Sequence, residues 1–301
     1  MSKREMVLQA DMAVSPAEIK EDKYKRFFSV FFKRPLVVLG TILILIFILV
    51  AIFAPLIAPY PPNHQDLANI LLPPSREHLF GTDALGRDVF SRIIFGTRIA
   101  IVVGVASLAI SAILGVILGV AAGYYGGLIE TIIMRIVDAL MTFPFILLAL
   151  TISALLGGGI QNVIIALGIG NLPTFARMMY SQTIAIKENE FIMAGRSLGC
   201  SNLRIIFKHI LPNALSPIIV LITMNIGGTI LAEAALSFLE IGIKPPTPAW
   251  GSLVYDGYAY LVTRPLLSIA PGIAIMIVVF GFNMLGDGLR DALDPRLRGI
   301  I

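Results

Sequence analysis

The sequence predicts an all-α integral membrane protein with about six transmembrane helices. Of its 301 residues, 57% are apolar and only 14% are charged, whereas about a quarter of the residues are charged in a typical soluble domain. A bilayer core requires about 20 consecutive apolar residues for each helical crossing. Five segments without Asp, Glu, Lys or Arg are long enough for a crossing: 35–65, 99–129, 139–176, 210–232 and 265–286.

Residues that break helices divide these segments into separate spans. Prolines at positions 59, 61 and 62 end the first span, because proline has no backbone N–H for a helical hydrogen bond. Three consecutive glycines at 157–159 divide the longest segment, which exceeds the length of one crossing. We therefore expect spans over 36–58, 98–121, 132–156, 160–180, 213–236 and 267–287.

Lysine and arginine are distributed unevenly between the two sides of this arrangement. With the N-terminus inside, the predicted cytoplasmic segments contain eight such residues in the N-terminal tail, four in the loop at 181–212 and three after the sixth span, at 288–301. The predicted outer loops contain five. Because cytoplasmic loops carry the excess of positive charge, we expect both termini in the cytoplasm.

The predicted spans divide the chain into five parts. These are a basic cytoplasmic tail at 1–34, the first transmembrane helix at 35–58, an extracytoplasmic loop at 59–97, a core transmembrane domain at 98–290 and a cytoplasmic tail at 291–301. Basic and aromatic residues are mixed in 23–34, which favours either an interfacial helix on anionic lipid or an unstructured basic tail. Cytoplasmic loop charge accounts for the net charge of +4, and we expect no nucleic acid as a partner.

The sequence contains no pattern that indicates an enzyme. It lacks His-Glu-x-x-His, Gly-x-Ser-x-Gly and the phosphate-binding Gly-x-x-x-x-Gly-Lys-Ser/Thr. Its three histidines, His64, His78 and His209, lie far apart in loops, so we expect no metal site. The chain is therefore predicted to be non-catalytic and to bind no cofactor of its own.

Two acidic residues lie within the predicted spans, where a charge is costly. Asp138 follows Arg135 by three residues, a spacing that favours an ion pair on one helix face. Glu233 lies near the outer end of the fifth span. Glu233 and Asp138 are candidates for lining a pathway, and the alternative for each is a position at the membrane interface.

The loop between the fourth and fifth spans has the pattern of two short helices. Glu188 and Glu190 suit the first turn of a helix, and Gly199 suits its end. Ser201 can cap a second helix, which Pro212 is expected to stop. This pattern predicts a helix-turn-helix that lies across the inner surface and that a partner can approach closely.

This loop resembles the EAA loop of ABC importer permeases, which presents a short coupling helix to a groove on the ATPase subunit. The matching residues are Glu190, Ala194, Arg196, Leu198, Gly199 and the segment 209–213, which runs from His209 through Pro212 to Asn213. The family usually has glutamate and alanine where this chain has Met193 and Gly195.

The resemblance implies a set of contacts with the ATPase subunit. Phe191, Met193 and Leu198 would provide packing contacts, and Arg196 and Arg204 would provide polar contacts. The small residues Ala194 and Gly195 would allow the partner to lie close.

Further segments resemble the dipeptide, oligopeptide and nickel group of these permeases. They are 78–92, 122–127, 135–144, 232–239 and 286–296. Together with the loop they cover nearly the whole chain after residue 35, in the order that the family has. The pattern is similar to that of the second permease type of these systems, which has a short loop after its first span.

The resemblance implies a channel-forming subunit of an ATP-driven importer in a bacterial or archaeal plasma membrane. The implied partners are a second homologous permease, two ATPase subunits that bind ATP and Mg, an extracytoplasmic substrate-binding protein and membrane lipid. Di- or oligopeptides are the expected substrate, and nickel or another small solute is the alternative within the family. A non-ABC channel or a membrane scaffold is the alternative of a different class.

The same resemblance implies that the loops at 59–97 and 237–266 meet the substrate-binding protein. The candidate contact residues are Asp83, Arg87 and Asp88 in the first loop and Trp250 in the second. The alternative for the three charged residues is a set of local ion pairs that stabilise their own loop.

Overall fold

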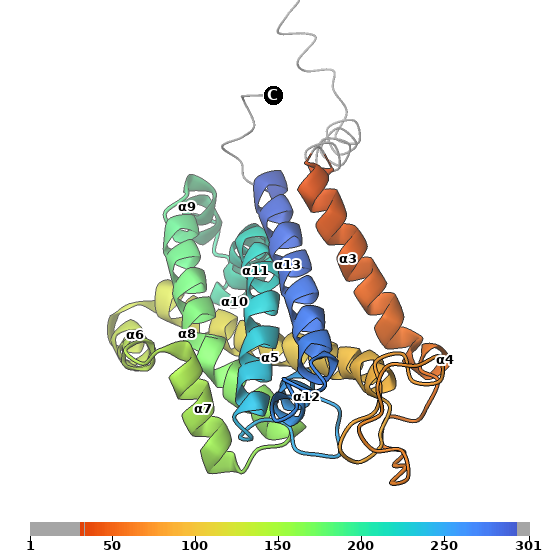
Figure 1. Ribbon diagram of the computed structural model, residues 1–301. Coiled ribbons are helices and arrows are strands. Elements are labelled where there is room, and N and C mark those ends of the chain that lie inside the picture. Colours follow the sequence, from red (N-terminus) through yellow and green to blue (C-terminus); the bar gives the residue numbers. More distant parts are fainter. Residues whose placement is uncertain (1–30, 33, 294–301) are drawn as a thin grey trace, which may run out of the picture.

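The computed structural model describes residues 31–32 and 34–293, which form a bundle of helices (Figure 1). Within this part of the chain there is no β-strand, only an isolated bridge between Thr82 and Asp88. The all-α class predicted from the sequence is confirmed. The helices are α3 (Pro35–Ile52), α4 (Ala54–Ile57), α5 (Val89–Tyr125), α6 (Gly127–Met141), α7 (Phe145–Leu156), α8 (Ile160–Lys187), α9 (Glu190–Ser197), α10 (Asn202–Ile205), the π-helix η1 (Ile206–Ile210), α11 (Leu211–Phe238), α12 (Trp250–Tyr258) and α13 (Leu266–Leu293).

The segment predicted as the third span is not one straight helix. α6 and α7 meet at an angle of 93° across a short break at 142–144. Pro144 precedes the first residue of α7, and a residue before proline is disfavoured in the helical conformation, so α6 cannot continue through Phe143. The span expected over 132–156 therefore consists of two helices that meet at a bend.

α5 and α8 run in the same direction and pack closely along their length. Gly115, Gly119 and Gly123 repeat every four residues along α5, and each faces α8. The contacts advance together along both helices, because Gly115 lies against Phe175 and Gly123 lies against Thr183. Small residues at this spacing allow two membrane helices to approach at backbone distance.

The directions of the helices determine how often the chain crosses the bundle. Because α5 and α8 are parallel, the bent pair α6–α7 must return the chain to the end where α5 begins. α3 and α13 are antiparallel, since Arg34 Nη1 lies 2.7 Å from Asp291 Oδ2 and Gly40 packs at Gly281. The bent pair thus counts as one crossing, and the expectation of about six transmembrane segments is confirmed.

The two ends of the bundle carry different segments. The start of α3, the end of α13 and α9 lie at one end (Figure 1). α12, the loop between α4 and α5 and the turn between α7 and α8 lie at the opposite end. The first end is called the α9 end below, and the second is called the α12 end.

Replacing Gly119 with alanine should force α5 away from α8. The added methyl group would lie 2.5 Å from the Ala176 carbonyl oxygen and 2.7 Å from Met179 Cβ. We expect the free energy of unfolding in detergent to fall by about 1–3 kcal/mol. Gly272→Ala on α13, where nothing lies within 4 Å of the added atom, is the matched control. Equal stability of the two variants would contradict the close packing described here.

Candidate functional site

The short helix α9 is held on the bundle by one buried isoleucine. Ile192 is 1% exposed and packs in a cluster with Ile205 and Ile210 from the following helices and Met179 from α8. Sequence reasoning singled out the neighbours of Ile192 and missed Ile192 itself. The sequence pattern could have identified Ile192, because an isoleucine recurs at the inward positions of each helix in this loop.

The other large apolar side chains of the loop point away from the bundle. Phe191 and Met193 are 45% and 53% exposed, and Leu198 is 85% exposed. Leu203 and Phe207 on the second helix are each 64% exposed and were not predicted. Exposed apolar groups are typical of an interaction surface, and these five side chains are together called the outer face of the loop below.

Gly199 forms the turn that the sequence predicts at the end of α9. Its φ angle of 77° lies in the left-handed region, which glycine adopts without steric cost. The N–H of Cys200 donates to the Gly195 carbonyl at 3.0 Å, so the last carbonyls of α9 are paired as in a Schellman motif. Ser201 then caps α10 by accepting a hydrogen bond from the Arg204 N–H.

The polar residues of the loop connect it to α5. The Arg196 guanidinium lies over the Tyr124 ring at 5.4 Å from the centroid, and the Tyr124 hydroxyl donates to Asn202 Oδ1 at 2.8 Å. Arg196 therefore packs on Tyr124 of its own chain and is also exposed at the surface. The side chains of Glu190 and Arg204 are exposed, and His209 lies 6.1 Å from Phe191 between ring centroids.

Pro212 does not stop the second helix of the loop. α10, the π-helix and α11 form one continuous helical segment from Asn202 to Phe238. Within the π-helix the Leu211 N–H donates to the Ile206 carbonyl, five residues back. This wider turn lies directly before the position where proline has no N–H to donate. The loop is consequently continuous with a membrane-spanning helix, and the predicted stop at Pro212 is wrong.

The predicted contact residues of the first outer loop are enclosed within that loop. Asp83 accepts hydrogen bonds from the backbone N–H groups of Leu85 and Arg87, and its Oδ2 lies 2.6 Å from Arg87 Nε. Arg92 Nε lies 3.7 Å from the same oxygen. A second carboxylate from α12, Asp256 Oδ2, lies 3.7 Å from Arg87 Nη2.

Asp88 has a separate structural role. It is the N-cap of α5, since its Oδ2 accepts from the Ser91 N–H at 2.7 Å, and its Oδ1 lies 2.9 Å from His78 Nδ1. This cap explains why α5 begins at Val89 and not at the predicted position 98. Asp83, Arg87 and Asp88 are all buried. They make local contacts within their own loop, which was the alternative to contact with a binding protein. Their contact with a partner stays a prediction.

Burial raises the pKa of Asp256, and the nearby Arg87 and Arg92 partly oppose that shift.

Trp250 lies at the start of α12 and is 3% exposed. Its Nε1 donates to the Ile93 carbonyl at 2.9 Å, so the ring holds the second outer loop against α5. Its predicted contact with a partner also stays untested.

The two acids within the predicted spans both contact other side chains of the chain. Asp138 pairs with Arg177 of α8 and not with Arg135. Glu233 is only 2% exposed, and its Oε1 accepts a hydrogen bond from the Ser237 hydroxyl at 2.7 Å. The carboxyl group of Glu233 is thus enclosed by protein, and its place on a pathway or at the membrane interface stays a prediction.

The family of the chain follows from comparison with known proteins. Residues 115–299 match the family described as binding-protein-dependent transport system inner membrane component. The chain belongs to this family. Residues 24–74 match a second description, the N-terminal transmembrane domain of oligopeptide transport permease C.

Individual relatives agree over almost the whole length of the chain. The dipeptide transport system permease protein DppC of Alkalihalophilus pseudofirmus is 47% identical over 266 residues, which is 88% of each chain. The glutathione transport system permease protein GsiD of Shigella boydii is 43% identical over 298 residues, covering 99% of this chain and 98% of the relative. The chain is therefore a permease subunit of an ABC importer, and it is a transport component and not an enzyme.

The fold is similar to that of a solved ABC transporter. The MetNI methionine ABC transporter, in an inward facing conformation, aligns with a TM-score of 0.50 at 21% identity, covering 68% of this chain and 94% of that chain. This similarity supports the expected fold, that of the transmembrane domain of type I ABC importers.

Proposed function

We propose that this permease subunit imports di- or oligopeptides with energy from ATP. The observation that carries the substrate class is the near full-length similarity to permeases named for dipeptide and glutathione transport. Glutathione is itself a short peptide, so both names describe one chemical class. The match of residues 24–74 to an oligopeptide permease domain supports the same assignment.

The proposed complex contains four kinds of subunit. This chain pairs with a second homologous permease, and two ATPase subunits bind ATP and Mg on the cytoplasmic side. An extracytoplasmic binding protein delivers the substrate at the α12 end. The α9 end, where α3 begins and α13 ends, is the cytoplasmic end in this proposal, which agrees with the excess of lysine and arginine in the segments predicted to be cytoplasmic.

The outer face of the coupling loop is the proposed contact with the ATPase. Its exposed Phe191, Met193 and Leu198 are apolar groups that a groove on the partner would cover. Movement of α9 would be transmitted through Ile192 to α8 and α11, and through Tyr124 to α5. ATP-driven closure of the ATPases would then tilt these helices as rigid bodies and switch a shared cavity between its two openings.

Purification of the chain from its native operon in mild detergent tests the composition of the complex. We expect mass spectrometry to identify two ATPases and a second permease in the purified material. Reconstituted with the binding protein in proteoliposomes, the complex should take up labelled peptide only when ATP is present. A chain that purifies without an ATPase would favour the channel or scaffold alternative, and ATP-driven uptake of nickel but not of peptide would favour the other substrate class.

A further inference from the structure

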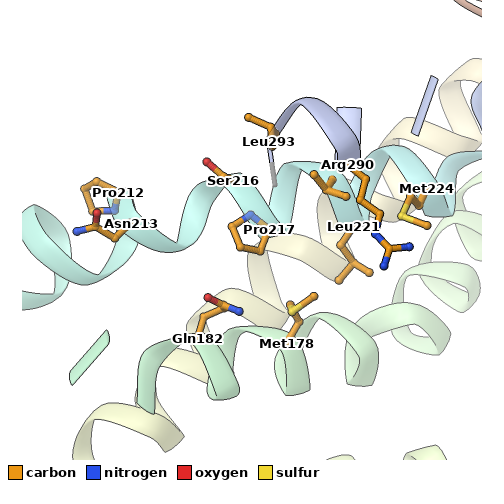
Figure 2. A pocket seen from close by; sticks show the side chains of 11 residues that line it. Met178, Gln182, Pro212, Asn213, Ser216, Pro217, Leu221, Met224, Arg290 and Leu293 are labelled. Carbon is orange, nitrogen blue, oxygen red and sulfur yellow. The ribbon is translucent and has the colours of Figure 1, made fainter. Parts of the chain in front are cut away.

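A cavity of about 640 Å³ opens between α8, α11 and α13 near the α9 end (Figure 2). Its volume lies in the range of pockets that hold small organic ligands. Apolar walls are provided by Met178 from α8 and by Leu221 and Met224 from α11. Such walls suit the side chains of varied peptides, because methionine adapts its shape to different neighbours.

The cavity has a positive group at one end. Arg290 of α13 lies beside Leu221 and Met224 in Figure 2, and its side chain is exposed. Its guanidinium makes no hydrogen bond or ion pair with the residues that the structure describes. The neighbouring acid Asp291 is paired with Arg34, and Asp287, one turn earlier on α13, does not line the cavity.

The opposite end of the cavity offers hydrogen-bond acceptors. Asn213 donates its side-chain N–H to the His209 carbonyl at 2.6 Å, which leaves its Oδ1 oxygen available. Pro217 lies four residues further along α11 and has no N–H, so the Asn213 carbonyl lacks its helical donor. Gln182 of α8 and Ser216 add polar side chains to this part of the wall.

The distance between the two ends matches a short peptide. The helical rise places Leu221 about 12 Å from Asn213 along α11. An extended peptide advances about 3.3–3.6 Å for each residue, so a chain of about three or four residues covers this distance. A long arginine side chain reaches into the cavity and also permits a shorter peptide.

We propose that Arg290 contacts the carboxylate of the transported peptide, while the Asn213 end accepts hydrogen bonds from its ammonium group. This inference rests on the proposed function and assigns a specificity-determining residue to the transport path. Guanidinium groups bind carboxylates through paired hydrogen bonds. The same positive charge disfavours a bare metal cation as the solute in this cavity.

The test uses the assembled importer in proteoliposomes with its own binding protein. ATP-driven uptake of a tripeptide is compared with uptake of the same peptide amidated at its C-terminus. An exposed ion pair contributes up to about 1 kcal/mol, so Arg290→Gln should lower uptake of the free peptide about three- to fivefold. Uptake of the amidated peptide should change little, and Arg290→Lys should retain most of the preference. Arg135→Gln, which removes an exposed arginine outside the cavity, is the matched control.

The outcomes separate this inference from the proposed function. Comparison between variants that share one binding protein cancels the selectivity of that protein. An equal loss for both peptides, or no loss for either, would overturn the assignment of Arg290. If the binding protein rejects the amidated peptide, uptake of the free peptide by the Arg290→Lys, Arg290→Gln and Arg290→Glu variants decides. Uptake that does not fall in that order overturns the assignment of Arg290. Failure of the unaltered complex to import any peptide would overturn the proposed function itself.

Discussion

Gly199→Val should uncouple ATP hydrolysis from transport. The φ angle of 77° at this position is strained for any residue with a Cβ atom and most strained for a β-branched one. Nothing lies within 4 Å of an added Cβ, so the effect arises from the backbone turn and not from a clash. The cost of about 1–2 kcal/mol or more should reorient α9 relative to α10 and lower ATP-driven uptake about tenfold.

Two measurements on the same proteoliposomes check this expectation. Uptake should fall while the ATPase activity continues and no longer responds to the loaded binding protein. Gly199→Asn is the control, because asparagine tolerates the left-handed conformation, and it should retain most of the uptake. Unchanged transport in the valine variant would rule out the assigned role of the α9 turn.

Asp83→Ala should cause a large loss of stability. The side chains of Arg87 and Arg92 are only 7% and 2% exposed, and Asp83 is the carboxylate that both approach. Its removal takes away the carboxylate that Arg87 and Arg92 share and leaves the backbone N–H groups of Leu85 and Arg87 without their acceptor. Breaking a buried ion pair by removing one partner costs about 3–5 kcal/mol, which unfolding of the purified chain in detergent would measure.

Asp256→Asn provides the matched comparison in the same network. The Asp256 side chain is 40% exposed and lies 3.7 Å from Arg87, a geometry in which ion pairs contribute about 0–1 kcal/mol. We therefore expect its unfolding to resemble that of the unaltered protein. Similar stability of the Asp83 and Asp256 variants would show that the network does not depend on Asp83.

The sequence predicts the spans well where hydrophobicity alone determines them. The bend in the third span lies at Pro144. A proline in an apolar run permits a bend without fixing its size. The early start of α5 was hidden because Arg92 and Arg98 lower the hydropathy of its first turns. Arg92 is accommodated there by Asp83, a partner brought close by the fold of the loop.

The candidate site was predictable only where its features depend on local sequence. Exposed Phe191, Met193 and Leu198 follow from a motif that the loop carries in its own sequence. Ile192 and the link between Arg196 and Tyr124 depend on contacts between segments far apart in the sequence. The continuity of the helix through Pro212 depends on a π-helical turn, for which sequence reasoning has no reliable pattern.

The bend between α6 and α7 has a consequence for biogenesis. α7 contains 12 residues and is therefore about 18 Å long, shorter than the apolar thickness of a bilayer. We therefore expect that α7 alone does not hold its segment in the membrane during synthesis. α8 packs against α7, so we expect the membrane topology of the central hairpin to be established by the two segments together.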